Sequence, residues 1–366
     1  DWLTQGPAVP KFEEAIADYC GARYGVAVNS ATSALHIACL ALGVRTGDYV
    51  WTSPNSFVAS SNCALYCGAQ VDFVDIDIQT GNMSVDALKE KLVQASLSNK
   101  LPKAIIPVHF AGQPCDMEQI HDLSKRYGFY IIEDASHAIG AKYKNSFVGS
   151  CEYSDICVFS FHPVKIITSM EGGMALTNNV KWADKMRMLR SHGITNDPAA
   201  MTEKPHGPWY YQQIDLGFNY RMTDVEAALG LSQLKKLSKF TEKRNSLAAH
   251  YDELLSELPG IHPLEQSEKS YSSYHLYVIR VEVLTHEQHA KLVTDLRTSS
   301  VFAHVHYIPI HLQPYYKAQG FTVGDFPNAE QYYAQTITLP LYPDLMKSDI
   351  HAIVEKLQTC IKRFMR

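Results

Sequence analysis

Short apolar runs alternate with helical stretches over the first two thirds of the chain, and this alternation limits the folds that it can adopt. The apolar runs are compact, as buried strands are, and lie at residues 25–29, 49–51, 71–74, 103–108 and 129–132. Helical stretches lie between them, at residues 31–42, 57–66, 85–93 and 117–127. Strands and helices in alternation predict an α/β fold, with a mainly parallel central sheet and helices on both faces.

The last third of the sequence has a different pattern. A long, charge-rich helical run from Thr223 to about Leu258 is followed by a strand at 276–283 and by helices at 286–296 and 348–364. We therefore predict a smaller C-terminal α+β domain. Its boundary is expected near residue 240, within the long helix, so that residues 1–240 form the large domain and residues 241–366 the small one.

Charge and hydropathy exclude several classes of protein. The chain has 33 Lys and Arg against 38 Asp and Glu, a net charge of −5, whereas nucleic-acid binders usually carry an excess of positive charge. A hydrophobic fraction of 46% is too high for a disordered chain. The longer apolar runs fall far short of the roughly 18 residues that a membrane span needs. We expect neither nucleic acid nor a membrane as a partner.

The cysteines and the start of the sequence bear on the compartment. Eight cysteines form no CxxC pair, which is typical of buried thiols in a reducing compartment, with a zinc site or a disulfide framework as the alternative. No HExxH motif is present, and we expect no metal site. The sequence begins at Asp1 with neither an initiator Met nor an apolar signal segment, so a cytoplasmic protein whose first residues are missing is expected.

Ligands of a parallel α/β sheet bind beyond the carboxyl ends of its strands, and one such end suits a phosphate. The segment from Asn29 to Leu35 passes from a strand into small hydroxyl residues that open a helix. The first N–H groups of a helix are free and lie at its positive end, where an anion binds. Any capped helix shares this pattern, however, and the sequence contains neither GxGxxG nor GxxxxGK[ST].

Two further strand ends carry residues that could do chemistry. A buried strand ends in Glu133 and Asp134. Asp134 could hold a metal, orient a histidine or pair with a protonated ring nitrogen, and a helix N-cap is the ordinary alternative. Lys165 follows a strand and Pro163 among apolar neighbours. Desolvation lowers the pKa of a lysine and makes its amine a usable nucleophile, although most lysines are solvated surface groups.

The combination of these features is more informative than any one of them. A phosphate site, a strand-end acid and a lysine with apolar neighbours follow one another along the chain. Pyridoxal 5'-phosphate needs these three contacts: the lysine forms the Schiff base, the acid keeps the ring nitrogen protonated, and a helix end holds the phosphate. The sequence therefore predicts pyridoxal 5'-phosphate as the cofactor.

Ordered motifs over nearly the whole chain resemble the DegT–StrS-type family of nucleotide-sugar aminotransferases, which have the type I fold of pyridoxal-phosphate enzymes. The motifs are Leu3-Thr4-Gln5-Gly6-Pro7, Asn29-Ser30-Ala31-Thr32, Glu133-Asp134-Ala135, Phe159-Ser160-Phe161-His162-Pro163-x-Lys165, Glu171-Gly172-Gly173, Arg190-Ser191-His192-Gly193, Leu216-Gly217-Phe218-Asn219-Tyr220-Arg221-Met222 and Val305-His306-Tyr307. So many ordered matches are not expected by coincidence.

The resemblance implies a role for individual residues around the cofactor. Lys165 would form the Schiff base and then shuttle protons, and Asp134 would pair with the pyridine nitrogen. The remaining cofactor contacts would be Phe57 stacked on one ring face, His137 beside O3′, and Ala31, Thr32 and Ser160 on the phosphate. Asn219 would reach the phosphate from the partner subunit, so the resemblance implies a homodimer with a shared active site.

The resemblance also implies contacts with the nucleotide sugar. They would come from two segments, Trp2-Leu3-Thr4 and His304-Val305-His306-Tyr307. Arg221, His304 and His306 are candidate donors to the diphosphate. Members of the family carry further residues before the position of Asp1, including part of the sugar site.

The implied reaction moves an amino group from L-glutamate to the C4 ketone of a UDP-linked 4-keto-6-deoxy-N-acetylhexosamine. The wording of several motifs is most similar to the branch of the family that serves pseudaminic acid biosynthesis and, with it, flagellin glycosylation, so a β-L-altrosamine derivative is the expected acceptor. Two alternatives stay open. A sugar dehydratase of this family would carry histidine in place of Lys165, and a non-catalytic cofactor-binding regulator would gain support from an appended DNA-binding module, which the chain lacks.

Overall fold

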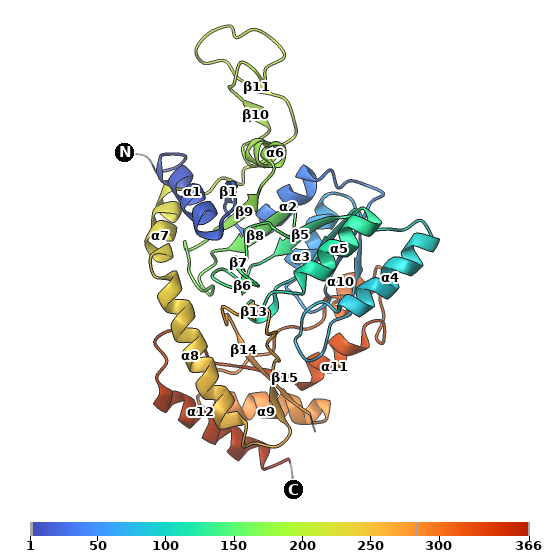
Figure 1. Cartoon of the computed structure of the whole chain (residues 1–366), viewed down its shortest axis with the longest axis vertical. Helices are drawn as coiled ribbons and strands as arrows, with labels where there is room; N and C mark the ends of the chain where they lie inside the picture. Colours follow the sequence, from blue (N-terminus) through green and yellow to red (C-terminus); the bar gives the residue numbers. More distant parts are fainter. Residues whose placement is uncertain (1–2, 283, 365–366) are drawn as a thin grey trace.

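A seven-stranded mixed sheet forms the centre of the protein (Figure 1). The computed structural model describes residues 3–282 and 284–364. Across the sheet the strands are β1 (Tyr24–Val28), β9 (Gly173–Thr177), β8 (Ile156–Ser160), β5 (Tyr130–Asp134), β4 (Ala104–Ile106), β2 (Tyr49–Thr52) and β3 (Gln70–Phe73). β9 pairs antiparallel with β1 and β8, and the other pairs are parallel. The prediction of an α/β fold with a mainly parallel sheet is confirmed.

Successive residues of the strands face opposite sides of the sheet, and each side is covered by its own helices. Val50 and Ile132 pack with α2 (Ala31–Ala41), α3 (Ala59–Tyr66) and α6 (Val180–Arg190). Their neighbours Trp51 and Ile131 pack with α4 (Val85–Leu97) and α5 (Met117–Tyr127) on the other side. The helices α1 (Ala8–Cys20) and α7 (Asp224–Leu234) cover that second side over β1, β8 and β9. Because both faces are buried, the strands read as nearly continuous apolar runs.

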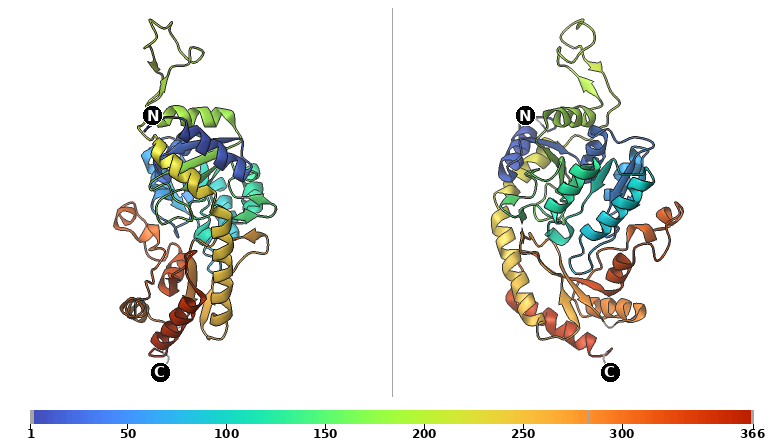
Figure 2. Two further views of the ribbon diagram at one scale, coloured as in Figure 1. Left: turned by 90° about the vertical axis from the view of Figure 1, so that its left-hand side faces the viewer. Right: turned by 45° about the vertical axis from the view of Figure 1, so that its right-hand side comes forward.

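The long helical run predicted after Thr223 is two helices. A capping box between Thr223 and Glu226 starts α7, and α8 (Leu237–Leu255) begins after a break at Lys235 and Lys236. From α8 the chain enters a second, antiparallel sheet of β12 (Ile261–Pro263), β14 (Tyr277–Val281) and β15 (Thr336–Leu339), which packs with α9 (His286–Thr298) and α12 (Lys347–Ile361) (Figure 2). The division at residue 240 falls within α8 and stays a prediction.

Part of the C-terminal third returns to the large sheet. The segment with η2 (Ile310–Leu312), α10 (Pro314–Lys317) and α11 (Pro327–Gln335) adds Ile310, Tyr316 and Tyr332 to the core beneath α2 and α3. Another three short strands, β6 (Lys142–Tyr143), β7 (Ser146–Phe147) and β13 (Ser270–Tyr271), pair with one another. These long-range contacts bring residues after 300 close to the ends of the central strands.

An arm that the sequence did not predict projects beyond α6. It spans residues 194–217 and carries β10 (Ile194–Thr195) and β11 (Gln212–Gln213), and it stands away from the body in every view (Figures 1 and 2). Its exposed side chains include Trp209 and Leu216, each with 75% of its surface accessible. Large apolar side chains so exposed on a projecting segment indicate an interaction surface.

Three properties of the described residues concern membranes, thiols and metal ions. None of the helices among them is long and apolar enough to cross a membrane. All eight cysteines are free thiols, and seven of them are buried. Within the same residues no group of three or more His, Cys, Asp or Glu side chains is arranged to hold a metal ion.

Candidate active site

A cavity of about 290 Å³ lies at the carboxyl ends of the parallel strands. Three neighbouring strands contribute to its lining. Asp134 ends β5, Ser160 ends β8, and Val108 lies just after β4. Eight residues that the sequence singled out line this one cavity: Ala31, Thr32, Phe57, Asp134, His137, Ser160, Lys165 and Tyr307. The sheet therefore gathers the predicted groups at one place.

The start of α2 forms a phosphate-sized anion site at one side of the cavity. Ser30 is the N-cap, in an extended conformation, and its hydroxyl accepts the N–H of Ser33. Ala31 and Thr32, the next two residues, line the cavity, and within the described part of the chain their N–H groups donate to no other residue. β9 passes so close that a Cβ at Gly173 would lie 2.5 Å from the Ala31 nitrogen, so glycine is required there.

Asp134 is held by two hydroxyl groups at the end of β5. Its carboxylate is 4% exposed and shares the side of the sheet that faces α3. Ser60 Oγ donates to Oδ2 at 2.6 Å, and Ser136 donates to Oδ1 from both Oγ, at 2.5 Å, and its backbone N–H, at 3.1 Å. A carboxylate that only accepts hydrogen bonds is in its ionised pattern and is oriented before any ligand arrives.

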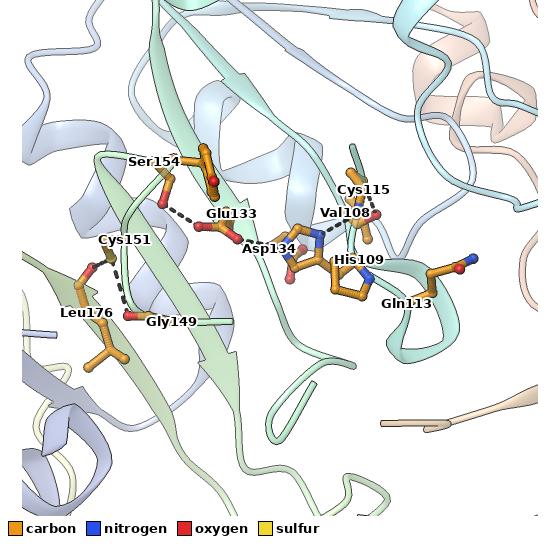
Figure 3. Close-up of polar contacts among 12 residues, drawn as sticks. Val108, His109, Gln113, Cys115, Glu133, Asp134, Gly149, Cys151, Ser154 and Leu176 are labelled. Carbon is orange, nitrogen blue, oxygen red and sulfur yellow. Dashed lines mark hydrogen bonds and ion pairs between the residues drawn. The ribbon is translucent and has the colours of Figure 1, made fainter. Parts of the chain in front are cut away.

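The other side of the same strand carries a second buried network (Figure 3). Glu133 accepts from His109 Nε2 at 2.6 Å and from the Ser154 hydroxyl, while His109 Nδ1 accepts the N–H of Cys115 at 3.2 Å. The backbone N–H of His109 donates to the carbonyl of Asp134 at 3.1 Å. This network ties the end of β4 to the end of β5 and so fixes the backbone from which the Asp134 carboxylate projects.

Lys165 lies in the loop between β8 and β9 and is partly buried at the cavity wall. Burial lowers the pKa of its amine to about 8, and the charge of Asp134 acts in the opposite direction. Among the described residues no carboxylate lies within the 4.0 Å of an ion pair with this amine. A much larger fraction of this amine than of an ordinary lysine is therefore neutral near physiological pH, and a nucleophile or a proton carrier requires the neutral form.

His137 and Tyr307 close the cavity on the side of the C-terminal third. The hydroxyl of Tyr307 lies 3.2 Å from His137 Nε2, and the ring of His275 packs on His137 with 4.4 Å between the ring centres. Burial, with a smaller contribution from Lys165, holds the pKa of His137 well below its usual range, so its ring is neutral. His137 Nδ1 is buried without a hydrogen-bond partner among the described residues, which leaves a polar atom for a ligand.

Several predicted residues are not in this cavity. Asn219 is exposed and pairs through its backbone with Ser191. Leu3 and Thr4 are exposed beside the start of α7, and Trp2 lies outside the described residues. His304, Val305 and His306 precede the cavity-lining Tyr307, but they do not line the cavity themselves. Arg221, like Asn219, is absent from the lining of this chain's cavity.

Some residues of the site were not predicted. Ser60 and Ser56 come from the first turn of α3 and the turn before it, Val108 lines the cavity, and His275 comes from the C-terminal third. Glu171 also lines the cavity, and the sequence had singled it out only as part of the motif Glu171-Gly172-Gly173, without a role. Ser136 directly follows the motif Glu133-Asp134-Ala135, but an isolated serine gives no signal of its own. The sequence placed a helix from 57 to 66, whereas α3 begins at Ala59, and the residues before it form the turn that reaches the cavity.

The residues present fit pyridoxal 5'-phosphate. One cavity combines four features. They are an anion site at the start of a helix, a buried carboxylate that suits a positively charged group, a lysine with a lowered pKa and an exposed aromatic ring at Phe57. The unpartnered His137 Nδ1 adds a polar atom that a ligand can satisfy. Anion, protonated ring nitrogen and carbonyl are the three groups that such a set recognises.

The chain belongs to the DegT/DnrJ/EryC1/StrS aminotransferase family, whose model matches residues 1–358. It is 37% identical to the spore coat polysaccharide biosynthesis protein SpsC of Bacillus subtilis, covering 99% of this chain and 91% of the relative. It is 36% identical to the UDP-4-amino-4,6-dideoxy-N-acetyl-β-L-altrosamine transaminase of Campylobacter jejuni, covering 99% of this chain and 92% of the relative.

Solved structures agree with the family. The Helicobacter pylori aminotransferase PseC, involved in pseudaminic acid biosynthesis, superposes with a TM-score of 0.90 at 32% identity over 99% of this chain and 93% of that one. The pyridoxamine-phosphate form of the sugar aminotransferase Spr1654 from Streptococcus pneumoniae gives 0.90 at 30% identity, over 99% of this chain and 94% of that one. The protein thus has the type I fold of pyridoxal-phosphate enzymes and is a sugar aminotransferase that uses this cofactor.

Proposed function

We propose that the protein transfers the amino group of L-glutamate to the C4 ketone of a UDP-linked 4-keto-6-deoxy-N-acetylhexosamine. The observation that carries the reaction class is the lysine of lowered pKa in one cavity with the hydrogen-bonded Asp134 and the free N–H groups of α2. The acceptor is proposed from similarity to transaminases that act on such sugars. Its use in pseudaminic acid biosynthesis and flagellin glycosylation stays a prediction.

The proposed roles follow the chemistry of each group. When bound, pyridoxal phosphate supplies an electron sink that stabilises negative charge on the carbon beside the amine. Lys165 binds the cofactor covalently and, once released, moves a proton to and from the reacting carbon. Asp134 holds the proton at the ring nitrogen, and the N–H groups of Ala31 and Thr32, together with the Ser160 hydroxyl, bind the phosphate. Phe57 covers one ring face, and His137 lies beside O3′.

The nucleotide sugar is proposed to bind at the mouth of the cavity. Tyr307 reaches the cavity, and His306 and His304 precede it with their ring centres 4.6 Å apart. Burial, followed by the proximity of His304 and Lys165, lowers the pKa of His306 to about 3. His306 is therefore neutral, and it can help to bind a diphosphate only as an N–H donor, without positive charge. Val305, Leu3, Thr4, Trp2 and Arg221 remain proposed contacts of the sugar nucleotide.

We also propose a homodimer in which Asn219 completes the partner's phosphate site. Asn219 follows the arm directly, is exposed, and does not line the cavity of its own chain. The exposed Trp209, Tyr211 and Leu216 give the arm an apolar surface that a second copy would cover. We also propose that the protein is cytoplasmic, because its free thiols are consistent with a reducing compartment.

Subunit mixing tests the shared site. We expect Asn219→Ala to weaken cofactor retention and Lys165→Ala to prevent covalent attachment. When the two variants exchange subunits, about a quarter of the sites should combine an intact Lys165 with an intact Asn219, because half of the dimers are mixed and half of their sites are complete. Dialysis followed by cofactor absorbance would measure a tightly bound fraction that neither parent shows. Retention equal to the average of the parents would contradict the shared site.

The substrate is tested with a panel of sugars. The protein is incubated with UDP-4-keto-6-deoxy-N-acetylhexosamines of different ring configuration and with a UDP-4-ketopentose, each with L-glutamate or L-glutamine, and products are distinguished by NMR. We expect the β-L-arabino-configured 4-keto sugar, the precursor of the altrosamine amine, to react fastest with L-glutamate, by tenfold or more in kcat/KM. A preference for the pentose would overturn the proposed acceptor. A C3-deoxygenated product would identify a dehydratase.

A further inference from the structure

Ser56, in the turn before α3, and Ser60, in the first turn of α3, form a chain of hydrogen bonds that ends on Asp134. Ser60 Oγ donates to Asp134 Oδ2 at 2.6 Å, and Ser56 Oγ lies 2.7 Å from Ser60 Oγ. A serine hydroxyl has one hydrogen, and that of Ser60 is used on the carboxylate. Ser56 must therefore donate to Ser60. The order Ser56 to Ser60 to Asp134 is fixed by the number of protons.

This chain of hydrogen bonds is almost completely buried, and only Ser56 and Asp134 border the cavity. Ser60 is 0% exposed, and Ser56 and Asp134 are each 4% exposed. In such surroundings a hydrogen bond to a charged acceptor is stronger than in water, and a hydroxyl that itself accepts a hydrogen bond becomes a better donor. Ser136, which donates to the other oxygen, belongs to the loop of Asp134 itself, whereas Ser60 comes from a separate element.

Apart from Lys165, the ionisable side chains that face Asp134 are neutral. The serine hydroxyl groups therefore have a strong influence on the basicity of its carboxylate. Lys165 faces the carboxylate from the loop after β8, and His137 faces it from the loop after β5. Tyr307 faces it from the C-terminal third, and Cys157 lies on the neighbouring strand β8. Burial raises the pKa of Tyr307 and of Cys157 and lowers that of His137, so these three are neutral at neutral pH. Glu133 projects from the opposite side of the strand and is neighboured by His109.

A carboxylate and a ring nitrogen that share a proton divide it according to their basicities. Each hydrogen bond donated to the carboxylate lowers its basicity and leaves the proton on the nitrogen. We propose that Ser60, aided by Ser56, is a positioning residue that orients Asp134 and keeps the shared proton on the ring nitrogen of the cofactor. This inference rests on the proposed pairing of Asp134 with that nitrogen.

The test uses the holoenzyme loaded with pyridoxal phosphate that carries ¹⁵N in its ring. The chemical shift of this nitrogen reports its protonation directly and is followed between pH 6 and pH 9. For Ser60→Ala we expect the signal at the low-pH end of the titration to move from the shift of the protonated ring toward that of the neutral ring, because the more basic carboxylate takes a larger share of the proton. The loss of one charge-assisted hydrogen bond should change this division by about tenfold. For Ser56→Ala we expect a smaller shift in the same direction, because the donor to Asp134 is kept.

A matched control is provided by the next residue. Ser61 is also 0% exposed, but its hydroxyl contacts Val58 and Tyr316 and not Asp134. Ser61→Ala should titrate like the parent protein while removing a buried hydroxyl from the same helix turn. With L-glutamate, Ser60→Ala should lower kcat and leave KM nearly unchanged. Thermal melting shows whether each variant folds, and if Ser60→Ala does not, the direction of the Ser56→Ala shift decides the inference.

The outcomes separate the inference from the function on which it rests. A Ser60→Ala holoenzyme that titrates like Ser61→Ala would overturn the role of Ser60. Asp134→Asn is included in the same series. If its nitrogen titrates like that of the parent protein, the pairing of Asp134 with the ring is itself wrong. If only Asp134→Asn shifts, the pairing stands and the inference about Ser60 fails alone.

Discussion

Replacing Lys165 with alanine is expected to abolish covalent attachment of pyridoxal phosphate and to lower kcat by about 10³-fold or more. The cavity contains no other lysine, so no second amine replaces it among the described residues. The anion site at α2 and the Asp134 carboxylate remain, and the variant should still bind the cofactor without a covalent link. Borohydride reduction followed by mass spectrometry of the intact protein measures the attachment.

Lys181→Ala is the matched control for this substitution. Lys181 is exposed in the first turn of α6 and does not line the cavity. Its loss should leave the reduced adduct and the rate unchanged. If Lys165→Ala gave a borohydride-stable adduct of the same yield, the covalent role of Lys165 would be wrong.

The pH dependence of attachment follows from the same amine. Burial lowers the pKa of Lys165 from its ordinary value of 10.5 to about 8 in the folded protein. Only the neutral amine attacks, so the rate of covalent capture by the cofactor-free protein should rise with pH and level off above about pH 8. Because the unfolded chain binds the extra proton between about pH 8 and 10.5, stability should also rise with pH over this window.

The direction of one variant checks this assignment of the pKa. The negative charge of Asp134 raises the pKa of Lys165 and opposes the effect of burial. Asp134→Asn should therefore move the midpoint of the capture rate to lower pH, as stopped-flow absorbance would show. A midpoint near 10.5 in the parent protein would contradict the burial of the amine.

The sequence was informative where local patterns and chain order carry the structure. The helix at 117–127 and the cap at Ser30 follow from short-range chemistry, and both are found as expected. The cavity could be predicted because the ends of parallel strands meet at one edge of a sheet, so Asp134 and Ser160 had to be neighbours.

The remainder depends on contacts between distant segments. Ser60 touches Asp134 across 74 positions of the chain, and Tyr307 touches His137 across 170. No periodicity signals either contact, because a single hydroxyl has no pattern of its own. The arm at 194–217 escaped prediction for a different reason: its strands are only two residues long, and its exposed aromatic side chains resemble neither a core strand nor an amphipathic helix.

Asp134→Asn is expected to lower kcat by about 10³-fold, the middle of the range for proton transfer by a positioned side chain, while cofactor affinity falls much less. The amide has nearly the same shape, and the phosphate site and Lys165 are untouched, so the cofactor should stay bound. An amide cannot hold a proton on the ring nitrogen as a carboxylate does, and its NH₂ would face Ser60 or Ser136, each of which donates to Asp134. Single-turnover absorbance with L-glutamate measures the loss.

Asp155→Asn separates this effect from the loss of a partly buried carboxylate elsewhere at the sheet. Asp155 precedes β8, and its carboxylate accepts the N–H of Ile131 at 2.7 Å, at the opposite end of the strands from the cavity. Its replacement should lower the melting temperature and leave the rate with L-glutamate within about twofold of the parent protein. Equal rate losses in the two variants would mean that Asp134 acts only through stability. A selective loss in Asp134→Asn would require its charge at the cofactor ring.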